Sequence, residues 1–233
     1  MNNFNISKWL RLTSSGPVTT SGSDDLVHLR QGDMDGACGP YCLYMALIAM
    51  GFIVRSDATD LSRHDGRTRE GRLRDAIKLF GTLSSNGTTD LELQWLADHF
   101  RTQKLHTEAL FGDNKKGFVA AAVKAIDDGG LPIIGLRWSK TFGGGGHWVL
   151  VVGYEWCDIG TANGNVKIQP TRLLCLDPGS PTPGIHGWNA VLDVYDEEGK
   201  AIHQGSLPLE HWSATGEVTK CQIDGGVVLS RLN

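Results

Sequence analysis

The sequence lacks the features that mark secreted, membrane-spanning and nucleic-acid-binding proteins. Its longest apolar run, Leu43–Val54, has twelve residues and is interrupted by Gly51, whereas a helix that crosses a bilayer needs about 20. The apolar patch in Met1–Leu12 contains Lys8 and Arg11 and precedes no small-residue cleavage site, so we expect no cleavable signal peptide. The 22 Lys+Arg and 26 Asp+Glu give a net charge of −4, without the basic excess of a general nucleic-acid binder. We therefore expect neither a membrane nor a nucleic acid as a partner.

Paired cysteines and metal-binding motifs are also missing. The five cysteines are odd in number and irregularly spaced: Cys38, Cys42, Cys157, Cys175 and Cys221. This usage is typical of free thiols in a reducing compartment, so we expect synthesis and folding in the cytoplasm. Export into a target cell by a secretion system that needs no signal peptide is a second expectation. No Cys-x-x-Cys, His-x-x-x-His or Walker motif occurs, and Gly143–Gly146 precedes a predicted strand, so we expect no metal and no cofactor.

What remains is the composition of a globular protein. Of the 233 residues 40% are hydrophobic and 21% charged, and a chain of this length buries a core without disulfides. The stretch 13–25 is small, polar and contains Gly and Pro. We therefore predict a flexible lead-in over residues 1–25 and a single domain over residues 26–233.

Hydrophobic periodicity changes once along the chain. A helical period predicts helices at Cys38–Met50, Glu70–Phe80, Asp90–Phe100 and Gly117–Asp127. After Leu131 the pattern predicts strands at Ile133–Trp138, His147–Tyr154, Val166–Gln169, Arg172–Leu176, Val191–Tyr195, Gly199–His203 and Gly226–Leu229. Helices followed by antiparallel strands indicate the α+β class, with helices packed on one side of a sheet.

The segment around Cys38 carries the clearest chemical signal. Gly36 and Ala37 lead directly into an apolar helix, which places Cys38 in its first turn. Backbone N–H groups and the helix dipole favour a thiolate there, so Cys38 is a candidate nucleophile. The alternative is a buried structural cysteine. A redox site of the thioredoxin type is excluded because three residues, not two, separate Cys38 from Cys42, which is predicted to pack in the core.

A thiolate nucleophile needs a base, and the base needs an orienting partner. His147 opens a predicted strand just after four glycines, where its ring would lie at a sheet end beside a loop. Asp177 follows the strand Arg172–Leu176 and is predicted to reach the far nitrogen of His147 across the sheet. The alternative for Asp177 is a structural role, because Asp-Pro-Gly is a common turn.

The order Cys, His, Asp resembles that of papain-fold cysteine peptidases, and most closely the C39-type branch found in bacteriocin-processing peptidases. The similarity rests on Gln31 followed by Cys38-Gly-Pro-Tyr-Cys-Leu-Tyr-Met45, on His147-Trp-Val-Leu-Val-Val-Gly, on Asp177-Pro178-Gly179 and on Leu209-Glu-His-Trp212. It covers about residues 28–232. The resemblance implies a papain-like cysteine peptidase fold, in which an N-terminal helical half packs on a C-terminal antiparallel β-sheet.

The resemblance also implies roles for individual residues. Cys38 would be the nucleophile, His147 the general base and acid, Asp177 the orienting group and Gln31 the side-chain oxyanion donor, beside the backbone N–H of Cys38. Gly146 and Trp148 flank the base and are expected to contact substrate. Small residues such as Gly-Gly are expected before the cleaved bond.

These features predict a cysteine endopeptidase that cleaves a protein or peptide substrate. Without an attached exporter, an interbacterial effector is our leading hypothesis for its role, with a dedicated inhibitor (immunity) protein that blocks the cleft in the producing cell. Two alternatives stay open at this point. One is a peptidoglycan amidase of the NlpC/P60 type, and the other is a catalytically inactive papain-fold binding module.

Overall fold

The computed structural model describes residues 3–32, 36–79, 87–110, 112, 115–140, 143–160, 166–194 and 209–232. Its helices are α1 (Cys38–Ala49), α2 (Arg55–Thr59), α3 (Arg69–Leu79), α4 (Asp90–Ala97) and α5 (Lys115–Asp127), with short 3-10 helices η1 (Leu61–Arg63) and η2 (Asp98–Gln103). Its strands are β1 (Asn3–Ile6), β2 (Leu10–Thr13), β3 (Gly16–Thr19), β4 (Leu105–Ala109), β5 (Leu131–Trp138), β6 (Gly146–Gly160), β7 (Val166–Leu176), β8 (Ala190–Asp193), β9 (Leu209–Ser213) and β10 (Val218–Arg231).

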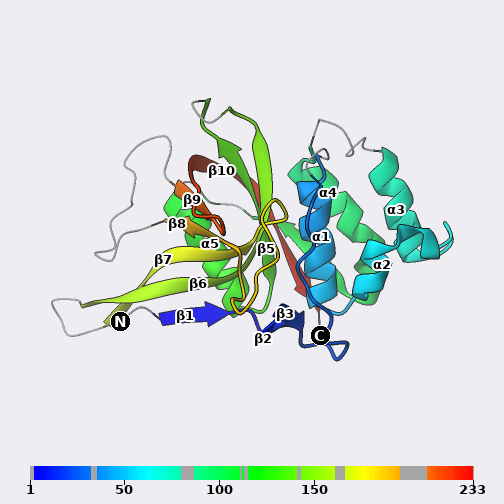
Figure 1. Cartoon of the computed structure of the whole chain (residues 1–233), viewed down its shortest axis with the longest axis horizontal. Helices are drawn as coiled ribbons and strands as arrows, with labels where there is room; N and C mark the ends of the chain where they lie inside the picture. Colours follow the sequence, from blue (N-terminus) through cyan, green and yellow to red (C-terminus); the bar gives the residue numbers. More distant parts are fainter. Residues whose placement is uncertain are drawn as a thin grey trace.

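The main sheet closes on itself into an antiparallel barrel. Neighbouring strands follow the order β6-β5-β10-β9-β8-β7, and β7 pairs again with β6 to complete a ring of six. Strand β1 extends the sheet beside β6, and β4 pairs with the end of β10. In Figure 1 these strands occupy the left and centre of the molecule, and β5 and β10 lie nearest the helices.

Closure depends on two long, bent strands. β6 pairs with β5 over its first residues and then with β7 over the remainder, and its register shifts between Val151 and Gly153 and between Glu155 and Trp156. β10 has a similar irregularity between Ile223 and Gly225, within its pairing with β5 and beyond the end of its pairing with β9 at Cys221. Bulges bend a strand and increase its twist, which is how a sheet of this length can close.

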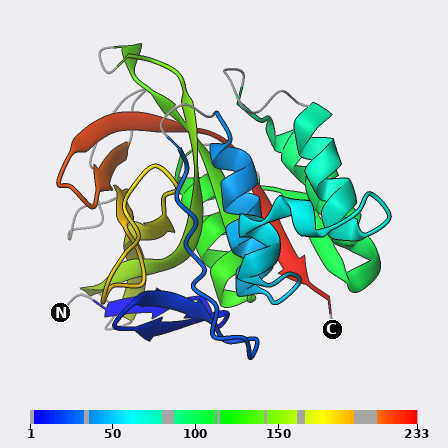
Figure 2. The ribbon, with the colours of Figure 1, turned by 45° about the vertical axis from the view of Figure 1, so that its right-hand side comes forward.

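Helices α1 to α4 form a layer beside the barrel (Figure 1), whereas α5 packs against β5, β6 and β10. α1 is buried on almost all sides, which its sequence allows because apolar residues surround the whole helix. It packs against β6 and β5, whereas α4 packs against β4 and β10. Figures 1 and 2 show α1 beside the strands, with α2 and α3 farther from the barrel.

The predicted papain-like arrangement, a helical half packed on an antiparallel sheet, is wrong. The mixed α+β content is present, but the strands form a closed barrel with helices beside it. The physical reason is that alternating hydrophobicity identifies single strands, whereas closure depends on the pairing of β6 with β7 and on bulges that the pattern does not mark.

Several predicted elements are confirmed and others differ. The four predicted helices correspond to α1, α3, α4 with η2, and α5. Val166–Gln169 and Arg172–Leu176 are one strand, β7, whereas β4 and β9 were not predicted from the pattern. The predicted strand Gly199–His203 lies outside the described residues.

Part of the predicted lead-in is also ordered as strands. Within residues 1–25, the structure describes β1 paired with β6 and a β2–β3 hairpin. Trp9, between β1 and β2, donates its Nε1 hydrogen to the carbonyl of Gly129 at 2.6 Å. Among the described helices, none has the length and apolar character needed to cross a membrane.

Candidate active site

Cys38 is the first residue of α1, and only 6% of it is exposed. Ala37 precedes it and provides no side-chain cap, and the first turn of α1, all of it described, contains no acidic residue. The positive end of the helix dipole is therefore directed at the sulfur without a competing carboxylate. The position matches the predicted one.

His147 lies next to Cys38 although 109 positions separate them in the sequence (147 − 38). It is the second residue of β6, opposite Leu136 of β5, and its side chain interacts with the thiol of Cys38. Its Nε2 is 2.7 Å from Oδ1 of Asp177, which leaves Nδ1 to face the sulfur. Trp138, at the end of β5, stacks on the ring with centroids 5.7 Å apart and planes inclined by 21°. About 15% of the His147 side chain remains exposed.

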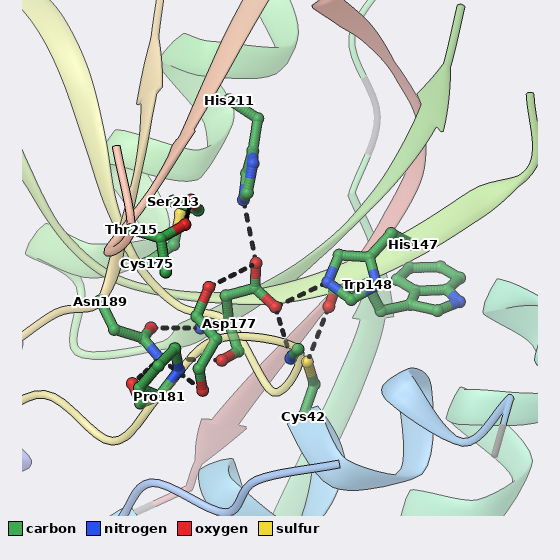
Figure 3. Close-up of polar contacts among 12 residues, drawn as sticks. Cys42, His147, Trp148, Cys175, Asp177, Pro181, Asn189, His211, Ser213 and Thr215 are labelled. Atoms are coloured by element: carbon green, nitrogen blue, oxygen red, sulfur yellow. Dashed lines mark hydrogen bonds and ion pairs between the residues drawn. The ribbon is translucent and has the colours of Figure 1, made fainter. Parts of the chain in front are cut away.

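Asp177 follows the end of β7, and its residue is only 3% exposed. Besides the bond to His147, its Oδ1 accepts the backbone N–H of Gly179 at 2.7 Å. Its Oδ2 accepts the hydroxyl of Ser180 at 3.5 Å. Figure 3 shows this carboxylate at the centre of the polar contacts. A buried carboxylate with several donors is held in one orientation.

Two further side chains hold the backbone around Asp177. Asn189 accepts the Asp177 N–H through Oδ1 at 2.7 Å and donates through Nδ2 to the carbonyls of Asp177 and Pro181, both at 2.9 Å. His28 lies 2.9 Å from the same Asp177 carbonyl through Nε2, which must donate because a carbonyl only accepts. Burial lowers the pKa of His28, so its neutral Nδ1 accepts the Thr182 hydroxyl at 3.1 Å.

A second imidazole approaches the carboxylate from the other side. Nε2 of His211, on β9, is 3.0 Å from Asp177 Oδ2, at ion-pair distance, although the approach is not aligned for a good hydrogen bond. Figure 3 shows His147 and His211 on separate oxygens of Asp177. Trp138 contacts His211 with its edge, with centroids 5.3 Å apart and planes inclined by 67°. Asp177 is therefore shared by two histidines.

These contacts shift the pKa values of the central pair in opposite directions. Burial alone would lower the pKa of His147, but its hydrogen bonds to Asp177 and Cys38 outweigh burial and raise it to about 10. Burial would raise the pKa of Asp177, yet the hydrogen bond from His147 and the His211 imidazole beside the other oxygen hold it well below its usual range. At neutral pH His147 is a cation between an anionic Asp177 and the sulfur of Cys38.

The other predicted site residues have distinct placements. Gln31 donates its backbone N–H to the carbonyl of Pro178 at 2.8 Å, so its main chain lies beside the turn that follows Asp177. Residues 33–35, between Gln31 and Cys38, lie outside the described residues, and an oxyanion role for Gln31 stays a prediction. Cys42 is fully buried and donates its thiol hydrogen to the carbonyl of Trp148 at 3.3 Å, and burial raises its pKa well above the usual value.

Two cavities flank the two histidines. One, of about 210 Å³, is lined by His147 together with the predicted substrate-binding residues Gly146 and Trp148. The other, of about 330 Å³, is lined by Trp138, Asp177 and His211 together with hydroxyl-bearing residues of β9 and β10 and of the turn that joins them. A substrate can therefore reach the exposed edge of His147 from a preformed cavity.

Sequence reasoning missed His28, Asn189 and His211. The sequence does carry a signal for His211. Leu209 and His211 are buried, and they alternate with Glu210 and Trp212, which are not. Such alternation indicates that His211 shares the buried face with Leu209. His28 and Asn189 stand in no motif or periodic segment, so no local pattern could have indicated their convergence on Asp177.

Comparison with known proteins identifies no family for this chain. No protein-family model matches the chain, and no curated protein matches its sequence.

Proposed function

We propose that this protein is a cysteine hydrolase that cleaves peptide bonds. One observation carries the proposal, namely that His147 interacts with Cys38 on one side and is hydrogen-bonded to Asp177 on the other. A nucleophile, a base that contacts it and a group that orients the base are the three parts that covalent acyl transfer needs.

The proposed mechanism uses each of these three side chains in turn. The Cys38 sulfur, as thiolate, attacks the carbonyl carbon of the scissile bond, and His147 donates its proton to the leaving nitrogen as the C–N bond breaks. The amine leaves, and the acyl group remains on Cys38 as a thioester. Water then attacks the thioester, His147 accepts a proton from it, and cleavage of the C–S bond regenerates thiolate and imidazolium. Asp177 keeps the ring oriented throughout.

The start of α1 supports the oxyanion of this reaction. The backbone N–H of Cys38 lies at the beginning of the helix, where such groups lack partners within the helix and the dipole favours negative charge. We assign this N–H as one oxyanion donor, and the side chain of Gln31 remains our prediction for the second.

The proposal depends on the triad and not on a papain-like fold. The resemblance to C39-type peptidases, the Gly-Gly preference, the effector role and the inhibitor partner stay predictions. The triad by itself also suits amide bonds outside proteins, and amidase activity on peptidoglycan is therefore an outcome that the following test distinguishes.

The test is covalent labelling by an electrophilic peptidyl probe, read by mass spectrometry. We expect labelling at Cys38, its loss in Cys38→Ala, and its retention in Cys157→Ala. Cys157 is a matched control because its exposure, 7%, is close to the 6% of Cys38 while it lies far along β6. Labelling elsewhere, or labelling that survives Cys38→Ala, would contradict the nucleophile assignment.

A second experiment identifies the substrate class. Native protein and Cys38→Ala are incubated with a whole-cell lysate, whose new protein N-termini are mapped, and separately with purified muropeptides. New N-termini that depend on Cys38 support a peptidase, whereas release of amines from muropeptides alone supports an amidase. No product from either, together with no probe labelling, supports the inactive binding module.

A further inference from the structure

The cavity of about 210 Å³ beside His147 is small and partly backbone-lined. Its walls come from the starts of β6 and α4, from β5 and from the bulge of β10. This volume is below the range of about 300–1,000 Å³ that is usual for small-molecule sites, so it suits one side chain of a longer ligand.

Gly225 forms the part of the wall at the β10 bulge. A Cβ added there would have Asp90 Oδ2 as its nearest neighbour, 4.0 Å away. The glycine therefore opens the cavity toward Asp90. A larger residue at position 225 would project into the same space without a clash against the backbone.

The cavity carries more negative than positive charge. It is lined by two carboxylates, Asp90 and Asp224, and Asp224 forms an ion pair with Arg137. The cationic ring of His147 also lines the cavity, but its charge is paired with Asp177. Asp90 is the first residue of α4, and its Oδ1 accepts the N–H of Leu91 at 2.9 Å. Within the described ranges, no lysine or arginine forms an ion pair with Asp90, so one negative charge of the cavity is unmatched.

A buried hydroxyl in the same cavity also awaits a partner. Thr88 is only 7% exposed, and its Oγ1 has no hydrogen-bond partner among the described residues. Its position is fixed, because its carbonyl accepts the Trp148 indole N–H at 2.8 Å and its side chain packs closely against Gly39, the neighbour of Cys38. An unpartnered buried polar atom is unfavourable, so a donor group of a ligand that reaches this hydroxyl would gain a hydrogen bond.

We propose that this cavity binds a basic side chain, lysine or arginine, of the peptide substrate, with Asp90 as counter-charge and the Thr88 hydroxyl as acceptor. The inference rests on the proposed function and names the substrate class of that site. A long basic side chain places its methylene groups along Trp148 and Leu136 and its charge at Asp90. An acidic side chain would be repelled, and an apolar one would bury Asp90 without a donor.

The experiment measures the rate at which electrophilic peptidyl probes label Cys38. The probes are identical except for one residue before the reactive group, which is lysine, arginine, norleucine, glutamate or glycine, tested at each of the first three positions. At one position we expect the probe with lysine or arginine to label Cys38 about tenfold or more faster than the probe with norleucine. Norleucine has the four-carbon stem of lysine without the terminal ammonium, so the ratio reports the contribution of the charged group.

Three variants assign that preference to the cavity. Asp90→Asn should bring the lysine-to-norleucine ratio close to one. Asp98→Asn removes an equal charge at the other end of α4, where the carboxylate is exposed, and should leave the ratio as it is. Gly225→Leu fills the cavity and should slow all probes with long side chains relative to the glycine probe, which keeps the test decisive if Asp90→Asn fails to fold.

The possible failures are distinguishable. Labelling of Cys38 with norleucine or glycine preferred at every position would overturn the basic subsite and leave the proposed function standing, and a preference for glycine would support the Gly-Gly expectation. A lysine preference that survives Asp90→Asn and Gly225→Leu would overturn the assignment to this cavity. No labelling of Cys38 by any probe would overturn the proposed function and this inference together.

Discussion

His147 and His211 both contact the carboxylate of Asp177, and the difference between them separates a catalytic role from a supporting one. Their Nε2 atoms lie 2.7 and 3.0 Å from separate oxygens of Asp177. His147 also interacts with Cys38, keeps 15% of its side chain exposed and borders a cavity. The side chain of His211 is 6% exposed, and its Asp177 contact is poorly aligned.

The comparison shows that proximity to a carboxylate does not define a general base. A base must also reach the nucleophile and the leaving group, and His147 meets the first condition through its second ring nitrogen. His211 can act only through Asp177, and it is therefore a positioning residue in our scheme. The following variants test this distinction.

The largest effect is expected from replacement of His147. We expect His147→Gln to lower kcat/KM by about 10⁴-fold or more, because the proton acceptor and donor is lost. The measurement is the initial rate of peptide cleavage. His64→Gln is the matched control, since His64 lies 2.8 Å from Asp57 in a similar pair, and activity close to native is expected there. An equal loss of kcat/KM in both variants would contradict the assignment of His147 as the general base.

Asp177→Asn should have the next largest effect. It loses the negative charge that stabilises imidazolium, and we expect kcat to fall by about 10³–10⁴-fold, as in other triads, while circular dichroism stays native. Asp193→Asn, another buried carboxylate that pairs with Arg172, is the control. Native kcat in Asp177→Asn would exclude Asp177 from the mechanism.

His211→Phe should have a smaller effect of another kind. It fills the space without a donor, and we expect kcat to fall about tenfold at constant KM. Because His211 helps to lower the pKa of Asp177, the acid limb of the pH–rate profile should move to higher pH. His211→Gln keeps a hydrogen-bond donor, so it should restore part of the native kcat and part of the native pH–rate profile. An unchanged pH–rate profile in His211→Phe would indicate that His211 contributes only to packing.

The smallest expected effect is on how the stability of the fold depends on pH. The pKa of His147 is raised from 6.5 to about 10 in the folded protein, so the contribution of its protonated form is complete below pH 6.5 and is lost as pH rises to about 10. We expect the free energy of unfolding, measured with urea, to decline over this range. The decline should be shallower in Asp177→Asn, and equal slopes would contradict the pairing.

Local patterns predicted the helix start at Cys38 and the strand edges at His147 and Asp177, because each depends on neighbours within one turn or one strand. They did not predict β4 or β9, which are short strands without a clear alternation of apolar residues over enough positions. They also assigned a flexible lead-in to a region in which β1 pairs with β6, since pairing partners distant in sequence leave no local signal.

Taken alone, the amino-acid order predicted the three residues of the proposed triad, the α+β content and the position of Cys38 in the first turn of α1. Only the tertiary structure decided that the sheet closes into a barrel, that His28, Asn189 and His211 converge on Asp177, and that Asp90 shares a cavity with His147. The reason is physical. Periodicity and capping act over a few residues, whereas barrel closure and buried polar networks depend on contacts between segments that are far apart in the chain.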